Sequence, residues 1–326
     1  MALASEDLAA AEHAGSEPAA RRQPALSPSR AGDFKQCPLL YRFRVVDRIP
    51  ELPSPIAVRG TVVHAVLERL YALPAEERVP ARAQELLEPV WRDLLAAEPE
   101  LAALFSEGDW ADTTPEQAAE PDATDTAEHA AAWLASARDL LESYFVLEDP
   151  RRLRPEACEL LVEAELEPAE DGGDPVLLRG YIDRLDVAPT GEIRVVDYKT
   201  GAAPREVGEA RALFQMKFYA VVLWRTRGVV PRQLRLIYLA DRQLLTYSPD
   251  EAELRRFERT LSAIWTAILK AGRTGDFRPR RSGMCDYCHH RAICPEFGGT
   301  PPPYPGWPSD GVLPDAGRET PLDRAE

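Results

Sequence analysis

The sequence lacks several features that would place it in common classes of protein. It contains no apolar run near the roughly 18 residues that a membrane-spanning helix needs, so no span is expected. Residues 1–24 are rich in Ala and Glu and lack the apolar core of a signal peptide, which predicts a cytoplasmic protein. The motif G-x4-G-K-[ST] is absent, so any nucleotide-driven motor would be a separate protein.

Lysine is also scarce. Lys35, Lys199, Lys217 and Lys270 are the only lysines among 39 basic residues. One of these few lysines, Lys199, follows an aspartate by two positions, and in a lysine-poor chain that placement is less expected as surface filler.

The net charge of −15 is unevenly distributed. Nineteen of the 54 acidic side chains lie between Leu73 and Pro150, where only four arginines occur, and the rest of the chain is balanced. Contact with phosphate depends on the local surface, and basic clusters surround Arg44, Arg152 and Arg280. Net acidity therefore weakens an interpretation as a nucleic-acid-binding protein without excluding it.

The order of the predicted elements is that of an α/β domain with a mixed sheet flanked by helices. Residues 1–25 and the Pro-rich residues 299–326 have little to bury and are expected to be disordered tails around one domain at 26–298. Periodicity predicts helices at 27–41 and 60–71, an acidic helical insertion at about 73–155 with a polar loop at 109–128, strands at 158–167, 177–187 and 193–199, a helix at 208–227, a strand at 234–239 and a helix at 250–270.

The two strands at 177–199 carry the strongest catalytic signal. Side chains alternate along a strand, so Asp197 and Lys199 project from the same face. A turn at residues 189–191 would place Asp183 opposite Asp197, where two carboxylates lie about 4.5–5.5 Å apart at Cβ and repel each other. A divalent cation between them would turn this repulsion into a binding site, and hard oxygen ligands suit Mg²⁺ or Mn²⁺.

The alternative for this hairpin is a solvated face whose charges have no chemical role. Against it, Val195 and Val196 precede Asp197 on opposite faces, which indicates a strand buried on both sides. Isolated charges in such a strand need a physical reason, because burial without a partner is unfavourable.

Three weaker signals lie on the flanking elements. His64 and Glu68 share one face of an apolar helix, and Gln215 and Tyr219 repeat the same spacing on a later helix. An amide and a phenol could contact a nucleotide, yet an ordinary helix surface explains them equally well. Two glutamates at 163 and 165 share a strand face, and either could support the metal, although they are most simply the solvated side of an edge strand.

The cysteines form a second pattern. Cys285, Cys288 and Cys294 are spaced C-x2-C-x5-C, and Cys37 precedes a proline as Cys294 does. Four thiolates suit Zn²⁺ or an iron–sulfur cluster. A triplet with a distant fourth ligand favours [4Fe–4S], whereas the histidines at 289 and 290 keep zinc open as an alternative. The fifth cysteine, Cys158, lies in an apolar strand and is predicted to be a small buried hydrophobe.

Taken in order, these motifs resemble the RecB-type exonucleases of the PD-(D/E)XK nuclease superfamily. The likeness is greatest to members with an iron–sulfur staple, both AddB-like proteins and CRISPR-associated adaptation nucleases. It covers roughly residues 26–298 and rests on six stretches: Leu26–Phe43, Gly60–Glu68, Gly180–Arg184, Asp197–Gly201, Gln215–Tyr219 and Cys285–Cys294.

The resemblance implies a restriction-endonuclease-like core and a role for each matching residue. The catalytic Mg²⁺ or Mn²⁺ would be held by His64, Asp183, Asp197 and the main-chain carbonyl of Tyr198. Lys199 would act on the attacking water, with Asp183 and Asp197 completing the catalytic set. Gln215 and Tyr219 would help to hold the DNA strand. The cluster ligands would be Cys37, Cys285, Cys288 and Cys294.

The function that the resemblance implies is metal-dependent exonuclease action on single-stranded DNA or DNA ends, in repair or recombination. The alternative is a non-catalytic DNA-end-binding or scaffold subunit of a helicase–nuclease complex, in which the helicase is a separate chain. The acidic insertion at about 73–155 is long for a minimal nuclease, so it could cap the cleft or dock a partner.

Overall fold

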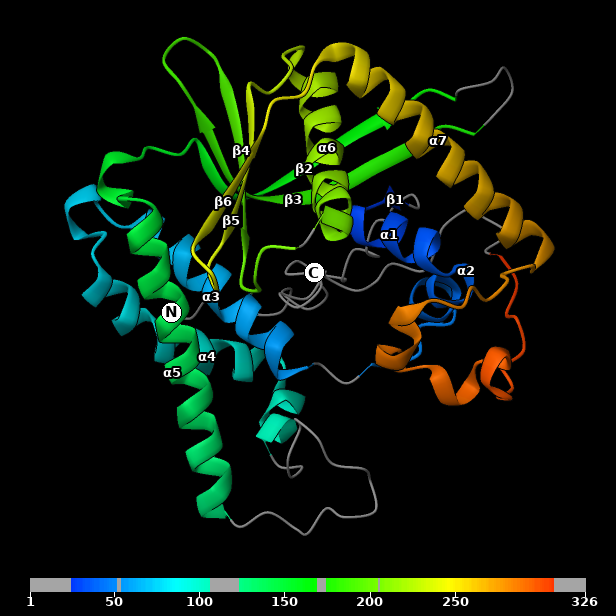
Figure 1. Ribbon diagram of the computed structural model, residues 1–326, viewed down its shortest axis with the longest axis horizontal. Helices are drawn as coiled ribbons and strands as arrows, with labels where there is room; N and C mark the ends of the chain where they lie inside the picture. Colours follow the sequence, from blue (N-terminus) through cyan, green and yellow to red (C-terminus); the bar gives the residue numbers. More distant parts are fainter. Residues whose placement is uncertain (1–24, 52–53, 106–122, 169–173, 205, 308–326) are drawn as a thin grey trace, which may run out of the picture.

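The computed structural model describes residues 25–51, 54–105, 123–168, 174–204 and 206–307. A six-stranded mixed sheet lies at its centre and helices cover both faces (Figure 1). No helix within the described ranges is long and apolar enough to cross a membrane.

Strand β3 organises the sheet. It pairs antiparallel with β2 along one edge, and on the other edge it pairs parallel with β1 and antiparallel with β4. Strand β5 continues the sheet parallel to β4, and β6 closes it antiparallel to β5. The strands are β1 (Ala25–Leu26), β2 (Ala157–Leu166), β3 (Val176–Val187), β4 (Ile193–Lys199), β5 (Gln233–Tyr238) and β6 (Gln243–Tyr247).

The predicted hairpin register is confirmed. Arg184 pairs with Val196, and the N–H of Ala188 donates to the carbonyl of Glu192 at 2.9 Å beside the predicted turn. Val195 and Val196 are both fully buried, on opposite faces of the sheet. The strand that carries Asp197 is therefore a central one, as the valine pair indicated.

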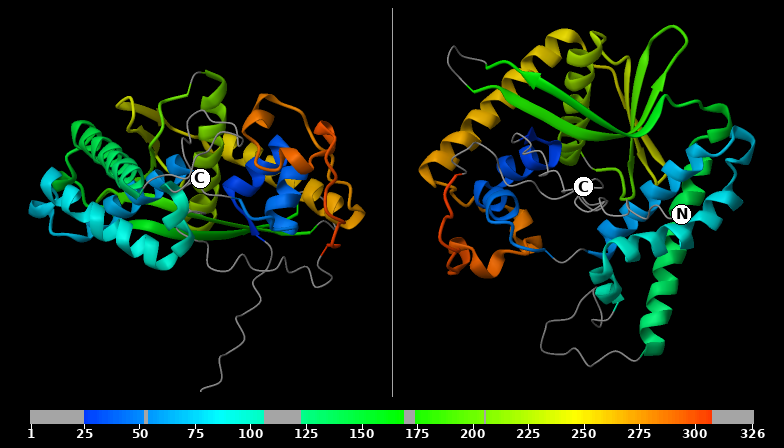
Figure 2. Two further views of the ribbon diagram at one scale, coloured as in Figure 1. Left: turned by 90° about the horizontal axis from the view of Figure 1, so that it is seen from below. Right: turned by 180° about the vertical axis from the view of Figure 1, so that it is seen from behind.

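One face of the sheet packs on helices from both ends of the domain. Val195 from the sheet shares a hydrophobic core there with Phe218 and Leu261. The N-terminal helices lie beside the C-terminal segment, blue next to orange in Figures 1 and 2. The helices of this face are α1 (Pro28–Gln36), α2 (Pro38–Tyr41), a π-helical turn (Arg42–Val46), α6 (Glu206–Arg227) and α7 (Glu251–Thr274).

The opposite face is covered by three helices, two of them from the acidic segment. Val196 shares this second core with Val66 of α3, Leu87 of α4 and Leu141 of α5. The insertion therefore belongs to the fold itself, because its apolar sides complete a core with the sheet. The elements are α3 (Pro55–Ala72), α4 (Pro80–Ala97), a 3-10 helix (Pro99–Phe105) and α5 (Ala123–Leu147). Other 3-10 turns lie at Ala75–Glu77, Pro150–Arg152, Gly283–Tyr287, Arg291–Ile293 and Pro295–Phe297.

Several predicted boundaries differ from the observed ones. The helix expected at 27–41 is broken at Cys37, where the backbone is extended and Pro38 starts a new helix. Ser27 caps its first part, because its side chain accepts the N–H of Arg30. Helix α3 begins at Pro55 rather than at Gly60, and α5 begins within the polar stretch expected as a loop. Most of that stretch, residues 109–122, lies outside the described residues.

Both predicted tails are shorter than expected where the structure describes them. Ala25 belongs to β1, and the segment up to Trp307 packs on the domain, with the Tyr304 hydroxyl donating to the Gly272 carbonyl at 2.6 Å. The indole of Trp307 covers Gly272 so closely that a Cβ there would lie 2.1 Å from the ring. The high proline content of this segment led to a prediction of disorder, but its aromatic side chains pack on the domain. Residues 1–24 and 308–326 lie outside the described residues.

Candidate active site

The candidate site forms where β3 and β4 separate. The β3–β4 ladder ends at the pair Arg184 and Val196. The next residues beyond this pair are Asp183 on β3 and Asp197 on β4. Beyond this point the N–H of Tyr198 donates to Oδ2 of Asp183 at 2.6 Å. A side-chain carboxylate thus satisfies the backbone donor in place of the partner strand, and the alignment fixes both acids at one spot.

Both carboxylates are buried. Asp183 is 7% exposed and Asp197 only 1%. The pKa of Asp183 is raised to about 6, mainly by burial and also by the negative charge of Asp197, while His64, Lys199 and the Tyr198 N–H act in the opposite direction. Two such groups in a desolvated position call for a cation nearby.

Lys199 supplies one of these positive charges. Its Nζ lies 2.9 Å from Oδ2 of Asp197 and donates to Oε1 of Gln215 at 2.8 Å. The Gln215 amide in turn donates to the Tyr219 hydroxyl at 3.3 Å. This chain of contacts runs from β4 to α6 and fixes the position of the ammonium.

The two residues of α6 have different surroundings. Gln215 lines a groove that runs away from the carboxylates, whereas Tyr219 is 5% exposed and lies behind it. The Tyr219 ring packs against Gly180, where a Cβ would come within 2.8 Å of it. Tyr219 is therefore placed to hold Gln215. Of the two residues, only Gln215 stays a predicted contact of a DNA strand.

His64 reaches the site from α3. Its Nε2 lies 3.0 Å from the carbonyl oxygen of Tyr198, and its Nδ1 lies 3.6 Å from Oδ2 of Asp183. Glu68, one turn further along, is exposed. The helix thus contributes the imidazole of the predicted pair and not the carboxylate.

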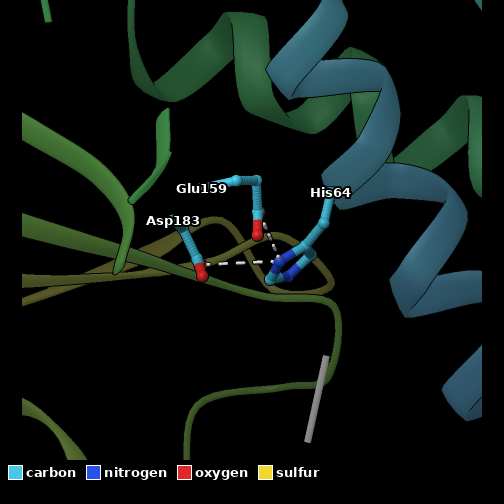
Figure 3. Close-up of side chains that lie close together, drawn as sticks. All are labelled: His64, Glu159 and Asp183. Carbon is cyan, nitrogen blue, oxygen red and sulfur yellow. Dashed lines mark ion pairs between the residues drawn. The ribbon is translucent and has the colours of Figure 1, made fainter. Parts of the chain in front are cut away.

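The sequence analysis did not single out Glu159. This residue lies on β2, and its Oε1 is 4.0 Å from Nδ1 of His64 (Figure 3). Single ligand atoms from His64, Glu159 and Asp183 all lie within 4.8 Å of one another. The signal that would have found it is the β2–β3 register, in which Cys158 pairs with Arg184 and thereby brings Glu159 opposite Asp183. The two strand glutamates that were considered, at 163 and 165, are exposed.

This donor set fits a hard divalent cation. It offers carboxylate oxygens, an imidazole and the carbonyl of Tyr198 within one buried corner. Oδ2 of Asp197 is buried without a hydrogen bond, and its contact in the described structure is the ion pair with Lys199. Oxygen-rich sites of this kind suit Mg²⁺ or Mn²⁺.

A groove of about 600 Å³ opens beside these residues. The catalytic side is formed by His64, Lys199 and Gln215, and the other walls come from α1 and the start of α6. Three basic side chains also line it, namely Lys35, Arg44 and Arg211. Arg44 is ion-paired with Asp33, which also lines the groove, and with Glu51, so the excess positive charge of the groove comes from Lys35, Lys199 and Arg211.

The four cysteines of the second pattern come together at the junction of α1 and α2 with the C-terminal segment. Cys37, Cys285, Cys288 and Cys294 line one small pocket, and none is in a disulfide. The N–H groups of Arg280 and Ser282 point to the sulfurs of Cys37 and Cys285, each at 3.4 Å. Burial raises the pKa of Cys288, and its three neighbouring cysteines raise it further.

Cys158 lies apart from this group. It packs against the core under α3, and burial raises the pKa of its thiol to about 12. The thiol stays protonated at neutral pH, but Cys158 is only half-buried and not fully buried as predicted.

Comparison with known proteins identifies the fold. The family model described as the PD-(D/E)XK nuclease superfamily matches residues 25–295. The chain belongs to this superfamily. Its mixed sheet and flanking helices are the restriction-endonuclease-like core.

Relatives of similar size occur in phages. The chain is 27% identical over 212 residues to the Gene 69 protein of Mycobacterium phage D29, covering 63% of this chain and 71% of that protein. It is 24% identical over 288 residues to the Gene 69 protein of Mycobacterium phage L5, covering 84% and 97%. A crystal structure named "Putative exonuclease", from Eubacterium rectale, aligns with a TM-score of 0.48 at 13% identity, covering 82% of this chain and 87% of that one.

Proposed function

We propose that this nuclease-superfamily protein is a metal-dependent DNA exonuclease that acts on single strands or DNA ends. The observation that carries the proposal is the convergence of Asp183, Asp197, His64 and Lys199 at the point where β3 and β4 separate. The complete set argues against the alternative of a scaffold that has lost catalysis.

The residues have separable tasks in this proposal. His64, Asp183, Asp197 and the Tyr198 carbonyl would hold Mg²⁺ or Mn²⁺. The cation, when bound, supplies Lewis-acid polarisation of a phosphoryl oxygen and lowers the pKa of water. Lys199 orients the attacking water and offsets charge that develops on the phosphate. Its contacts with Asp197 and Gln215 hold the ammonium beside the proposed metal ligands.

The groove supports a polynucleotide substrate. Lys35 and Arg211 would contact phosphates as a strand leaves the catalytic residues, whereas the guanidinium of Arg44 is held by Asp33 and Glu51. The side chain of Lys35 lies over the ring of Phe214 at 4.0 Å, which restricts its orientation. Together with Gln215, these residues form a track along one strand.

We also propose that the cysteine pocket holds a [4Fe–4S] cluster. A single Zn²⁺ needs all four sulfurs about 2.3 Å from one point. Within the described residues, three ligand atoms lie inside 4.8 Å of one another at the His64 site, whereas the sulfurs of the four cysteines lie further apart. The wider spacing supports a cluster, and so do the two N–H groups directed at sulfur.

Colour and metal content test this assignment. Protein prepared without oxygen should be brown, with broad visible absorbance and about four iron atoms per chain. A colourless preparation with one zinc ion per chain would contradict it.

The cellular setting follows from the resemblance alone. We propose a cytoplasmic role in DNA repair or recombination, with strand separation supplied by a separate helicase. In that setting the cluster would tie the N-terminal helices to the C-terminal segment of the domain.

Digestion of end-labelled oligonucleotides tests the function. Single- and double-stranded substrates labelled at the 5′ or the 3′ end would be incubated with the protein and Mn²⁺ or EDTA. We expect stepwise loss of label that needs Mn²⁺ and favours single strands. Binding of DNA without degradation would support the scaffold alternative instead.

A further inference from the structure

Glu159 adopts a backbone conformation that is unusual for its place. Its φ is 47°, although it lies within β2 between two residues that pair regularly with β3. Left-handed backbone is unfavourable for a residue with a Cβ, because the Cβ comes too close to the following carbonyl oxygen. The other described non-glycine residues with positive φ are Arg48 and Arg242, and both lie outside strands.

A second unfavourable feature falls on the same residue. The pairs Cys158–Arg184 and Leu160–Ile182 bring Glu159 directly opposite Asp183, so two carboxylates meet across the sheet. Like charges in this relation destabilise a sheet. The side chain of Glu159 is only 12% exposed, so water does little to screen the repulsion.

The direction of the Glu159 side chain explains both the strained backbone and the repulsion with Asp183. Figure 3 shows the carboxylate of Glu159 turned toward His64 and Asp183 rather than out to solvent. The three ligand atoms lie within 4.8 Å of one another, close to the roughly 4.2 Å that separates opposite ligands of Mg²⁺. A regular strand conformation would carry the side chain elsewhere, because side-chain direction follows backbone geometry.

We propose that Glu159 is an additional ligand of the catalytic cation and that its strained backbone exists to aim the carboxylate at it. The inference rests on the proposed metal centre and adds a residue from a third strand. The cation is then held by side chains of α3, β2, β3 and β4. Metal-free protein bears the strain and the repulsion, and binding of the cation offsets both.

The test uses two substitutions and two matched controls. Glu159→Gln keeps the shape and removes the charge, whereas Glu159→Gly removes the side chain and relieves the strain. Arg242→Gly relieves a positive φ away from the site, at 55°, and also removes the hydrogen bond that Arg242 donates to Ser143 at 3.1 Å, so it serves as a control for Mn²⁺ affinity. Glu165→Gln removes a charge from an exposed position on the same strand. Melting temperatures in EDTA and Mn²⁺ affinity by calorimetry are measured for each.

The proposal predicts opposite effects on stability and affinity. Glu159→Gly should raise the melting temperature in EDTA by about 2 °C and weaken Mn²⁺ binding at least tenfold. Glu159→Gln should weaken Mn²⁺ binding to a similar degree without unfolding the protein. Arg242→Gly should leave Mn²⁺ affinity unchanged, and Glu165→Gln should change neither the affinity nor the melting temperature.

The outcomes separate this inference from the proposed function. Mn²⁺ affinity within twofold of wild type in both Glu159 variants would overturn the role of Glu159, whatever the nuclease activity. A wild-type protein that binds Mn²⁺ but leaves DNA intact would contradict the exonuclease proposal and leave the Glu159 measurements valid. A wild-type protein that binds no Mn²⁺ would overturn both.

Discussion

At the scale of single residues, Asp183 combines burial, a like-charged neighbour and a backbone hydrogen bond. Its place opposite Asp197 could be predicted, because alternation along a strand and the length of a turn depend on local sequence alone. The part played by Glu159 could not be predicted. Its conformation depends on the pairing of β2 with β3, and nothing in the neighbouring sequence marks a strained residue.

Asp183 should make the stability of the metal-free protein dependent on pH. Its pKa of about 6 in the fold exceeds the ordinary value of 3.8, so the folded protein holds this proton more tightly than the unfolded chain does. Its contribution to stability is therefore present below about pH 4 and lost as the pH rises through about 6. In EDTA at pH 7, Asp183→Asn should melt at a higher temperature than wild type.

The same comparison at low pH serves as the control. Near pH 4 the wild-type carboxyl is neutral, so the difference between the two proteins should disappear. A wild-type melting temperature equal to that of Asp183→Asn across the whole range would contradict the burial of a charged Asp183.

At the scale of elements, a buried arginine ties the acidic segment to the catalytic hairpin. Arg184 of β3 is fully buried and donates to Glu148, just after α5, at 2.8 and 3.2 Å. It also donates to the hydroxyl of Tyr198 at 2.6 Å, and the main-chain carbonyl of the same tyrosine faces His64. The segment that composition marks only as acidic thus supports the strand that carries the site.

Removal of Glu148 should therefore be strongly destabilising. Glu148→Ala leaves the guanidinium of Arg184 buried with fewer partners, and we expect a loss of about 3–5 kcal/mol in the free energy of unfolding by urea. Glu142→Ala, at an exposed position of α5, should stay within about 0.5 kcal/mol of wild type. A loss below about 1 kcal/mol in Glu148→Ala would contradict the role of this ion pair.

The docking of the C-terminal segment is a second element-scale feature that sequence concealed. Its contact lies between Trp307 and Gly272, 35 positions apart in a Pro-rich region, and composition there predicts disorder. Strand β6 was also missed, because it is a short, largely exposed edge strand without strict alternation. In both cases the partner surface, and not the local pattern, decides the structure.

A double-mutant cycle measures this docking. Gly272→Ala places a Cβ 2.1 Å from the Trp307 ring and should cost about 1–3 kcal/mol of stability. In a Trp307→Ala background the same change should cost less than half as much, because the clash is gone. Additive effects would show that the segment does not rest on α7 in solution.

At the scale of the whole molecule, an acidic chain presents a basic groove beside its buried carboxylates. The mixed sheet with flanking helices could be predicted from the order of the elements, and the two-sided burial of β4 from its adjacent valines. The groove combines α1, β4 and α6 and is visible only in the folded chain. Binding of a strand there should weaken with salt through release of counterions.

Salt dependence tests which groups contact phosphate. Lys35→Ala should weaken binding of single-stranded DNA and reduce the slope of log affinity against log salt by about 0.7, the value for one phosphate contact. Lys270→Ala removes an exposed lysine outside the groove and should leave the slope unchanged. Equal slopes for the two variants would contradict the proposed track.

The rate of Mn²⁺-dependent degradation of end-labelled single-stranded DNA by wild type and by Lys199→Ala tests the central claim most directly. We expect Lys199→Ala to retain Mn²⁺ binding and the wild-type melting temperature to within a few degrees, and to lose at least about 100-fold in rate. Lys217→Ala removes a lysine of α6 that pairs with Glu253 of α7, and this variant should degrade DNA at the wild-type rate. Degradation by Lys199→Ala at the wild-type rate would contradict the assignment of the site.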